Sequence, residues 1–279
     1  MKSNRSTLEE SAAEIERVCI RMSKPICRGN PNTPKIALTF DDGPDETVTP
    51  PLLDVLKKHR IRATFFCVGT RVMAHPSLVQ REDDEGHVVC SHTYTHKTLV
   101  GMTDTETLDT LAKTNYAIKS AIMKTPAYFR PPGGFTNDHV NNLAETLGLT
   151  PILWTGCEIG WPLRNRFTSA SAVLHDFDGW SVDAMIDVLM SARNGWIFLC
   201  HDAYDAGDGE SGSVRGICKG DALKEALDTS IPKLQREGFV FVTIPDLLQD
   251  YKQNRNHELI GKVNSGRMQI GRHFFRRRA

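Results

Sequence analysis

Two adjacent carboxylates stand at the end of an apolar run near the start of the chain. The stretch Lys35–Pro44 reads KIALTFDDGP, so Asp41 and Asp42 follow a buried-type strand and precede a Gly-Pro turn. Two carboxylates at such a position are costly unless a cation, an arginine or hydrogen bonds compensate. A turn in which Asp42 caps the next helix explains one acid but not both, so the pair favours a functional site.

Two histidines are candidates to share a metal site with these acids. His92 and His96 stand four positions apart in SHTYTH, and on one helical turn such a pair shares a face and can hold a divalent ion. With Asp42 as third ligand, two nitrogens and one oxygen suit Zn²⁺, Co²⁺ or another borderline cation and leave positions for water and substrate. The pattern predicts a catalytic metal site, with Asp41 left as general base.

Two further groups follow predicted strands. Arg130 opens RPPGG, and a permanent cation beside Asp41 would keep that carboxylate ionised and oriented. Gly133 permits close backbone approach, so a main-chain N–H can face a developing oxyanion. His201 follows an apolar run and is a candidate general acid. Taken alone, RPPGG is better explained as a turn and His201 equally well as a structural residue, so the assignment depends on their occurring together.

The elements that must position these groups alternate along the chain. Periodicity predicts strands at 36–41, 63–69, 87–91, 128–130, 150–154, 195–200 and 239–243 and helices at 46–59, 75–86, 104–124, 137–147, 182–193 and 221–237. This order is typical of an α/β protein with a parallel sheet covered by helices, either doubly wound or closed as a barrel. Because polar clusters follow five different strands, we favour the barrel, in which strand ends converge on one mouth.

Composition and charge bear on the cellular compartment and on the classes of binding partner. Lys+Arg and Asp+Glu balance at 34 each, so no overall field directs the chain to nucleic acid, and no apolar run is long enough to predict a membrane span. The first 17 residues show no apolar signal region, which predicts a cytoplasmic protein, or a secreted one if a leader has been removed. The seven cysteines are scattered; Cys19 and Cys27 are the pair that an oxidising compartment would join.

The chain is expected to contain one catalytic domain with two extensions. We place an N-terminal extension at residues 1–33, the domain at 34–252, and a flexible basic tail at 253–279 that ends in GRHFFRRRA. Residues 155–179 interrupt the alternation and are interpreted as an insertion.

Together the motifs resemble the polysaccharide deacetylases, the NodB homology domain of carbohydrate esterase family four. TFDDGP, HTYTH, RPPGG and FLCHD resemble the family's first, second, third and fifth motifs, in family order. The resemblance implies a distorted (β/α)7 barrel, with Asp41 as base, Arg130 orienting it, His201 as acid, and Asp42, His92 and His96 on one metal. It also implies substrate contacts from Pro132, Gly133, Trp161 and Leu199, the last in an acetyl pocket.

Two motifs depart from the family's pattern. An aromatic residue is usual where this chain has Gly133, so a more open groove wall is expected there. The fourth motif usually carries two acids before a tryptophan, but Cys157 and Gly160 precede Trp161 in those places. A downstream alternative, Asp176–Trp180, keeps one Asp and a Trp. We place the motif at Trp161, which lacks both usual acids, and expect any carboxylate partner of His201 to be Asp176 or Asp178.

The resemblance implies metal-dependent removal of acetyl groups from a carbohydrate, with an N-acetylglucosamine polymer such as chitin or peptidoglycan as the expected substrate. Two alternatives stay open: an amidase or O-acetyl esterase acting on a small cyclic amide or on xylan, and a degenerate glycan-binding domain without turnover. Nothing in the sequence indicates the oligomeric state.

Overall fold

The strand that ends in the two acids is central to a parallel sheet. In the computed structural model, which describes residues 24–156, 172–173, 181–203 and 220–249, β1 (Lys35–Asp41) pairs with β2 (Thr64–Cys67) on one side and β6 (Ile197–His201) on the other. Beyond β2 the order continues through β3 (Val88–Ser91), β4 (Tyr128–Phe129) and β5 (Thr150–Pro151). β7 (Val240–Phe241) pairs with the first two residues of β1.

Short segments bridge the two outer strands, β5 and β6. Ile26 pairs with Ile152 and Arg28 with Trp196 in isolated bridges, so residues that we place before the domain in sequence pair with segments adjoining its outer strands. Nearer the carboxyl ends, the Thr155 N–H donates to the Ile197 carbonyl at 3.1 Å, and Val173 pairs with Leu199. The sheet is therefore curled into a distorted barrel, the alternative that the polar clusters after five strands favour.

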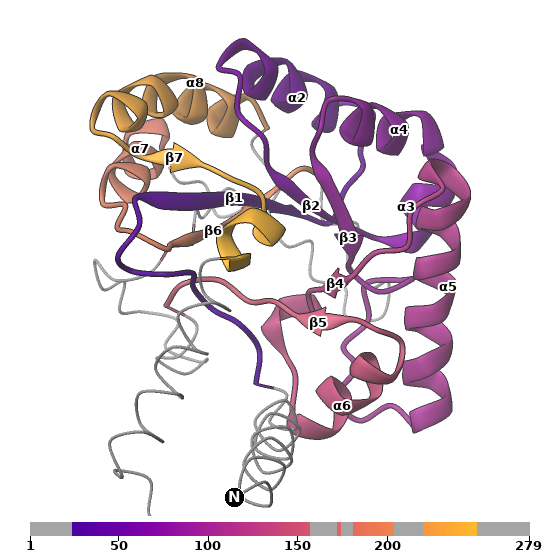
Figure 1. The fold of residues 1–279 in the computed structure, drawn as a ribbon. Helices are drawn as coiled ribbons and strands as arrows, with labels where there is room; N and C mark the ends of the chain where they lie inside the picture. The colour runs from indigo at the N-terminus through magenta and orange to yellow at the C-terminus, as the bar shows by residue number, and fades with distance from the viewer. Residues whose placement is uncertain (1–23, 157–171, 174–180, 204–219, 250–279) are drawn as a thin grey trace, which may run out of the picture.

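The helices lie around the outside of this sheet (Figure 1). All six predicted helices are present, most of them shorter than predicted: α2 (Thr49–Lys58), α4 (Pro76–Asp84), α5 (Asp104–Ile122), α6 (Asp138–Thr146), α7 (Val182–Met190) and α8 (Gly220–Arg236). The structure adds α3 (Gly69–Ala74), which periodicity missed because six residues carry too little of it.

Local hydrogen bonds explain where helices begin. The prediction started the first helix at residue 46, but Asp45 Oδ1 accepts the N–H groups of Thr47 and Val48 and holds a turn there. Helix α2 therefore begins at Thr49, with Pro50 in its first turn, where a missing N–H costs nothing. Helix α5 begins at a capping box between Thr103 and Glu106.

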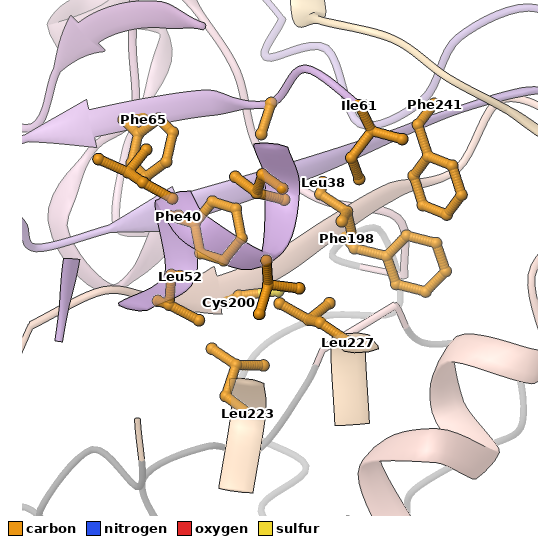
Figure 2. Close-up of a cluster of buried hydrophobic side chains, with 14 of the residues drawn as sticks. Leu38, Phe40, Leu52, Ile61, Phe65, Phe198, Cys200, Leu223, Leu227 and Phe241 are labelled. Carbon is orange, nitrogen blue, oxygen red and sulfur yellow. The ribbon is translucent and has the colours of Figure 1, made fainter. Parts of the chain in front are cut away.

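Alternation along β1 divides the interior into two layers. Ile36, Leu38 and Phe40 face the helices and are fully buried. Figure 2 shows Leu38 and Phe40 with Leu52 of α2 and with Leu223 and Leu227 of α8. Each such side chain contributes about 1.5–3 kcal/mol when fully buried.

The opposite face of β1 points into the barrel. At the amino ends of the strands this interior is apolar; its members are Ala37, Phe66, Cys90, Ile152, Ile197, Val242, Ile244, Leu247 and Leu248. Towards the carboxyl ends the inward positions of β1 become polar, with Thr39 and Asp41. The barrel is thus packed at one end and chemically functional at the other.

Some sequence predictions lie outside the described residues. These are Cys19, Trp161, the alternative fourth motif at 176–180 and the basic tail. Among the helices that the structure describes, none combines the length and hydrophobicity needed to cross a membrane.

Candidate active site

Both acids at the end of β1 reach the same group of side chains. Successive residues of a strand point to opposite faces, but Asp42 leaves the extended conformation with φ 77°. His92 Nε2 consequently lies 3.2 Å from Asp42 Oδ1 and 3.7 Å from Asp41 Oδ2. Both carboxylates are buried, so each requires compensation by neighbouring groups.

The two histidines lie on the loop after β3. The prediction that one helical turn carries them is wrong: residues 92–96 form an irregular loop in which Thr93 and His96 have φ of 65° and 59°. These left-handed residues fold the loop back on itself, and the ring centroids of His92 and His96 come within 4.9 Å. The pair therefore shares a site without sharing a helix.

Asp42 Oδ1 is the point on which both rings converge. It lies 3.2 Å from His92 Nε2 and 3.1 Å from His96 Nε2, and the three potential ligand atoms lie within 4.8 Å of one another. Two ligands about 2.0–2.1 Å from one tetrahedral ion are roughly 3.3 Å apart, close to the observed separations. Although buried, Asp42 Oδ1 accepts no well-aligned hydrogen bond among the described residues. The donor set fits a divalent cation.

The surroundings of this cluster favour negative charge on Asp42 and orient His92. Burial alone would raise the pKa of the Asp42 carboxyl, but the charges and ring nitrogens of His96 and His92, with a smaller effect from His201, hold it well below its usual range. His92 Nδ1 lies 2.7 Å from the Arg130 carbonyl oxygen. That contact directs Nε2 at Asp42, as second-shell hydrogen bonds do for metal-binding histidines.

Arg130 is fully buried against Asp41. Its Nη1 donates to Asp41 Oδ1 at 2.6 Å and to Thr39 Oγ1 at 2.8 Å. The Nε and Nη2 groups donate to the carbonyls of Ile152 and Leu153, and the guanidinium stacks over the Phe66 ring at 4.2 Å. Since most of its donors are occupied, Arg130 holds Asp41 in one orientation and supplies the opposite charge.

His201 ends β6 beside the acids. Its register partner on β1 is Asp41, and its charge is one of the influences on the pKa of Asp42. The next residue, Asp202, is completely buried: its Oδ2 accepts from Thr49 Oγ1 at 2.7 Å and its Oδ1 from the Gly43 N–H at 3.2 Å. Burial raises the pKa of Asp202 to about 7, against the effect of the Thr49 hydrogen bond.

An apolar cluster adjoins these polar groups. Leu199, Leu153 and Trp154 pack together, and each is less than one-tenth exposed. The Trp154 ring also lies 5.9 Å from Arg130 Cζ. This is the place where the resemblance puts an acetyl pocket, and its side chains suit a methyl group.

The turn after Arg130 has aromatic rings on both of its glycines. Pro132 is buried, and a Cβ on Gly134 would come within 2.7 Å of the Trp154 ring. A Cβ on Gly133 would lie 2.9 Å from the Phe135 ring. The more open wall expected at Gly133 is therefore partly filled by the side chain two residues later.

Sequence reasoning missed Thr39 and Thr49 and assigned no role to Trp154. Thr39, which donates to the Phe198 carbonyl and receives Arg130, shares the inward face with Asp41 two positions later, so strand alternation could have revealed it. Thr49 carries no motif signal, because tertiary contacts position it, and Trp154 is predicted only to follow a strand. The structure brings Asp41, Asp42, His92, His96 and Arg130 together at the carboxyl ends of the strands, and the roles assigned to them stay predictions.

Comparison with known proteins gives one consistent family. The model of the polysaccharide deacetylase family matches residues 28–152. The peptidoglycan-N-acetylglucosamine deacetylase PgdA of Listeria monocytogenes is 35% identical over 76% of this chain, which spans 38% of that protein's length. A peptidoglycan-N-acetylglucosamine deacetylase of Bacillus cereus is 34% identical over 78% of this chain and 91% of the relative.

Solved structures agree with the fold. The Bc1960 peptidoglycan N-acetylglucosamine deacetylase superposes with a TM-score of 0.67 at 30% identity, over 80% of this chain and 92% of that one. Other similar proteins are named chitin or chitooligosaccharide deacetylases, and one structure at 28% identity is described as a pseudoenzyme of the family.

Proposed function

Because the chain belongs to the polysaccharide deacetylase family, we propose that it is a metal-dependent hydrolase that removes acetyl groups from an N-acetylglucosamine polymer of the chitin or peptidoglycan type. The names of its relatives support the substrate class. The reaction is hydrolysis of the amide: a water oxygen bonds to the carbonyl carbon, the carbon–nitrogen bond breaks, and acetate and a free amine leave.

One observation carries this proposal. Asp42 Oδ1 lies within 3.2 Å of Nε2 of both His92 and His96, and Asp41, next in the chain, is paired with the buried Arg130 at 2.6 Å. A cation cradle therefore adjoins a carboxylate kept available for proton transfer. A structural metal site would not require the second acid.

Asp42, His92 and His96 would hold the ion, and we take it to be Zn²⁺ because two imidazoles and one carboxylate suit that metal; Co²⁺ suits the same ligands. The chemistry that a divalent ion supplies at such a site is polarisation of a carbonyl and activation of water.

The protein's own residues divide the remaining work. Asp41 accepts the proton of the attacking water, since Arg130 holds its carboxylate in position. His201, beside Asp41 across the sheet, donates a proton to the departing amine. A main-chain N–H at Gly133 faces the developing oxyanion, while Leu199 receives the acetyl methyl group. Pro132 and Trp161 complete the predicted substrate contacts.

The direct test is acetate release by the purified protein from an N-acetylglucosamine tetramer and from acetylated peptidoglycan. We expect acetate from at least one of them, loss of activity after treatment with a chelator, and recovery on adding Zn²⁺ or Co²⁺. Acetylated xylan and a small cyclic amide are tested in parallel.

The other results would each identify a different function. Release from xylan or the cyclic amide alone would replace the proposal with the esterase or amidase. Tight tetramer binding without release in the metal-loaded protein would indicate a glycan-binding domain, an outcome made relevant by the altered fourth motif and by the pseudoenzyme among similar structures.

A further inference from the structure

Phe135 is an exposed aromatic residue on the rim of the site. It is 45% exposed, whereas Phe40, Phe65 and Phe198 of the core strands are fully buried. Phe135 ends the turn that begins at Arg130, whose side chain binds Asp41 and whose carbonyl contacts His92. Phe135 is thus only five positions along the chain from Arg130, which lies at the centre of the site.

The turn holds this ring in a defined place. Gly133 has φ 60°, and a Cβ there would approach both Cδ2 and Cε2 of Phe135 to 2.9 Å, so this edge of the ring lies close to the glycine. The Phe135 N–H donates to the Pro132 carbonyl at 3.2 Å, which fixes the backbone of the turn. The Cδ2–Cε2 edge of the phenyl ring therefore lies against the turn, and the residue keeps nearly half of its surface in contact with solvent.

The same turn separates this ring from the apolar cluster below. Gly134 packs on Trp154, which contacts Leu199 and is only 7% exposed. Trp154 is therefore largely covered by the turn, whereas Phe135 remains available on the outside. An aromatic ring that is held along one edge and is open to water can stack on the apolar C–H face of a ring-shaped ligand.

We propose that Phe135 is a specificity-determining residue: it stacks against the pyranose ring of a sugar adjacent to the one being deacetylated. This inference rests on the proposed function, because a polymer must cross the rim to place one acetyl group beside Asp41. Phe135 has no hydroxyl group, so it recognises the apolar face of the sugar and selects for chain length rather than for a particular substituent.

The experiment compares Phe135→Ala, Phe135→Trp and wild type, all metal-loaded, on two substrates. For the N-acetylglucosamine tetramer, we expect Phe135→Ala to weaken calorimetric binding and lower kcat/KM by about 10-fold, which corresponds to about 1.4 kcal/mol. Phe135→Trp should retain both values. For the small activated ester 4-nitrophenyl acetate, all three proteins should be equal, because this substrate has no second ring.

Tyr116→Ala is the matched control. Tyr116 is 71% exposed on α5 and outside the site, so its loss should change neither substrate. Unchanged tetramer binding in Phe135→Ala would overturn the inference while leaving the proposed function in place. Equal losses on tetramer and small ester, or a change of oligomeric state, would also overturn it, since these indicate a structural or intersubunit role. A wild type that neither binds nor hydrolyses the tetramer would refute the proposed function, and this inference with it.

Discussion

Asp42 and Glu82 are two buried carboxylic acids whose surroundings act on them in opposite directions. In each, one buried oxygen has no hydrogen-bond partner among the described residues. Burial raises the pKa of both, but the imidazoles around Asp42 reverse the effect and leave its pKa well below the usual range. Around Glu82 no described cation does so: burial and the nearby Asp202 carboxylate raise its pKa well above the usual range, and the weak Cys67 hydrogen bond opposes them only slightly.

The comparison shows that neighbouring groups, and not burial alone, decide whether a buried carboxyl group is ionised. Both acids have lost water, yet Asp42 faces two ring nitrogens from one loop and Glu82 faces a thiol and another acid. A carboxylate among cation-binding groups can stay ionised and bind a metal. A carboxyl group without such partners stays neutral over more of the pH range. At high pH its burial lowers the free energy of unfolding.

The largest effect is expected from removing Asp42. Asp42→Ala takes away the oxygen on which both histidines converge, so affinity for Zn²⁺ should fall by at least about 100-fold and turnover with it. Metal content after dialysis and calorimetric titration measure this. Glu82→Gln is the matched control and should keep full metal content. Equal Zn²⁺ affinity in Asp42→Ala and wild type would contradict the ligand assignment, as would full activity of metal-depleted His92→Ala.

The next effect distinguishes the two adjacent acids. Asp41→Asn keeps the shape of the side chain but cannot accept a proton, so the protein should retain Zn²⁺ while kcat falls by about 10²–10⁴-fold. Parallel metal analysis and acetate release show whether binding and turnover separate. If Asp41→Asn loses the metal and Asp42→Ala does not, the two roles are reversed.

His201 and Asp202 lie between the surroundings of Asp42 and those of Glu82. Replacing His201 should have an intermediate effect on activity. His201→Ala should slow amide hydrolysis by about 10²-fold or more and spare an activated ester, because a good leaving group needs no proton. Equal losses on both substrates would exclude His201 as the acid.

The partner of His201 can be found from the pH dependence. Val173, three positions before Asp176 in the sequence, pairs in parallel with Leu199, two positions before His201. A carboxylate from Asp176 or Asp178 would stabilise the protonated imidazole, so its replacement by Asn should move the alkaline decline of the pH–rate profile to lower pH. No movement in either variant would mean that neither acid pairs with His201.

The smallest effect is on stability. Because the pKa of Glu82 is higher in the folded protein, the native state holds its proton longer, and the free energy of unfolding falls as pH rises from about 4.5 through the folded pKa. Glu82→Gln removes this dependence, so the variant should match wild type at pH 4 and be more stable at pH 8.

Denaturant unfolding at the two pH values measures this difference. Asp84→Asn, an exposed acid on the same helix, should give no such divergence and serves as the control. Parallel stability curves for Glu82→Gln and wild type would show that Glu82 is not held neutral.

Much of the fold and the outline of the site follow from sequence, for physical reasons. The strand–helix rhythm and the polar residues after strands depend on local periodicity, and these predictions agree with the sheet around β1. The turn that directs both Asp41 and Asp42 into the site requires a positive φ at Asp42. The loop that brings His92 close to His96 requires one at residues such as Thr93. Residue type does not signal these values. Glu82 escaped notice because a single acid within a polar helix looks exposed until the helix is packed.

The way in which the barrel is bridged has a consequence for how the protein is made. All three candidate ligands are encoded before residue 97, on the loops after β1 and β3. In contrast, the contact between Thr39 and Phe198 joins residues 159 positions apart, and the bridges from Ile26 and Arg28 reach to Ile152 and Trp196. On the ribosome, the cation cradle is therefore synthesised long before the strand that brings His201. Until β6 arrives, one edge of β1 is unpaired and open to association with other chains, and contacts of such long range make the final closure slow.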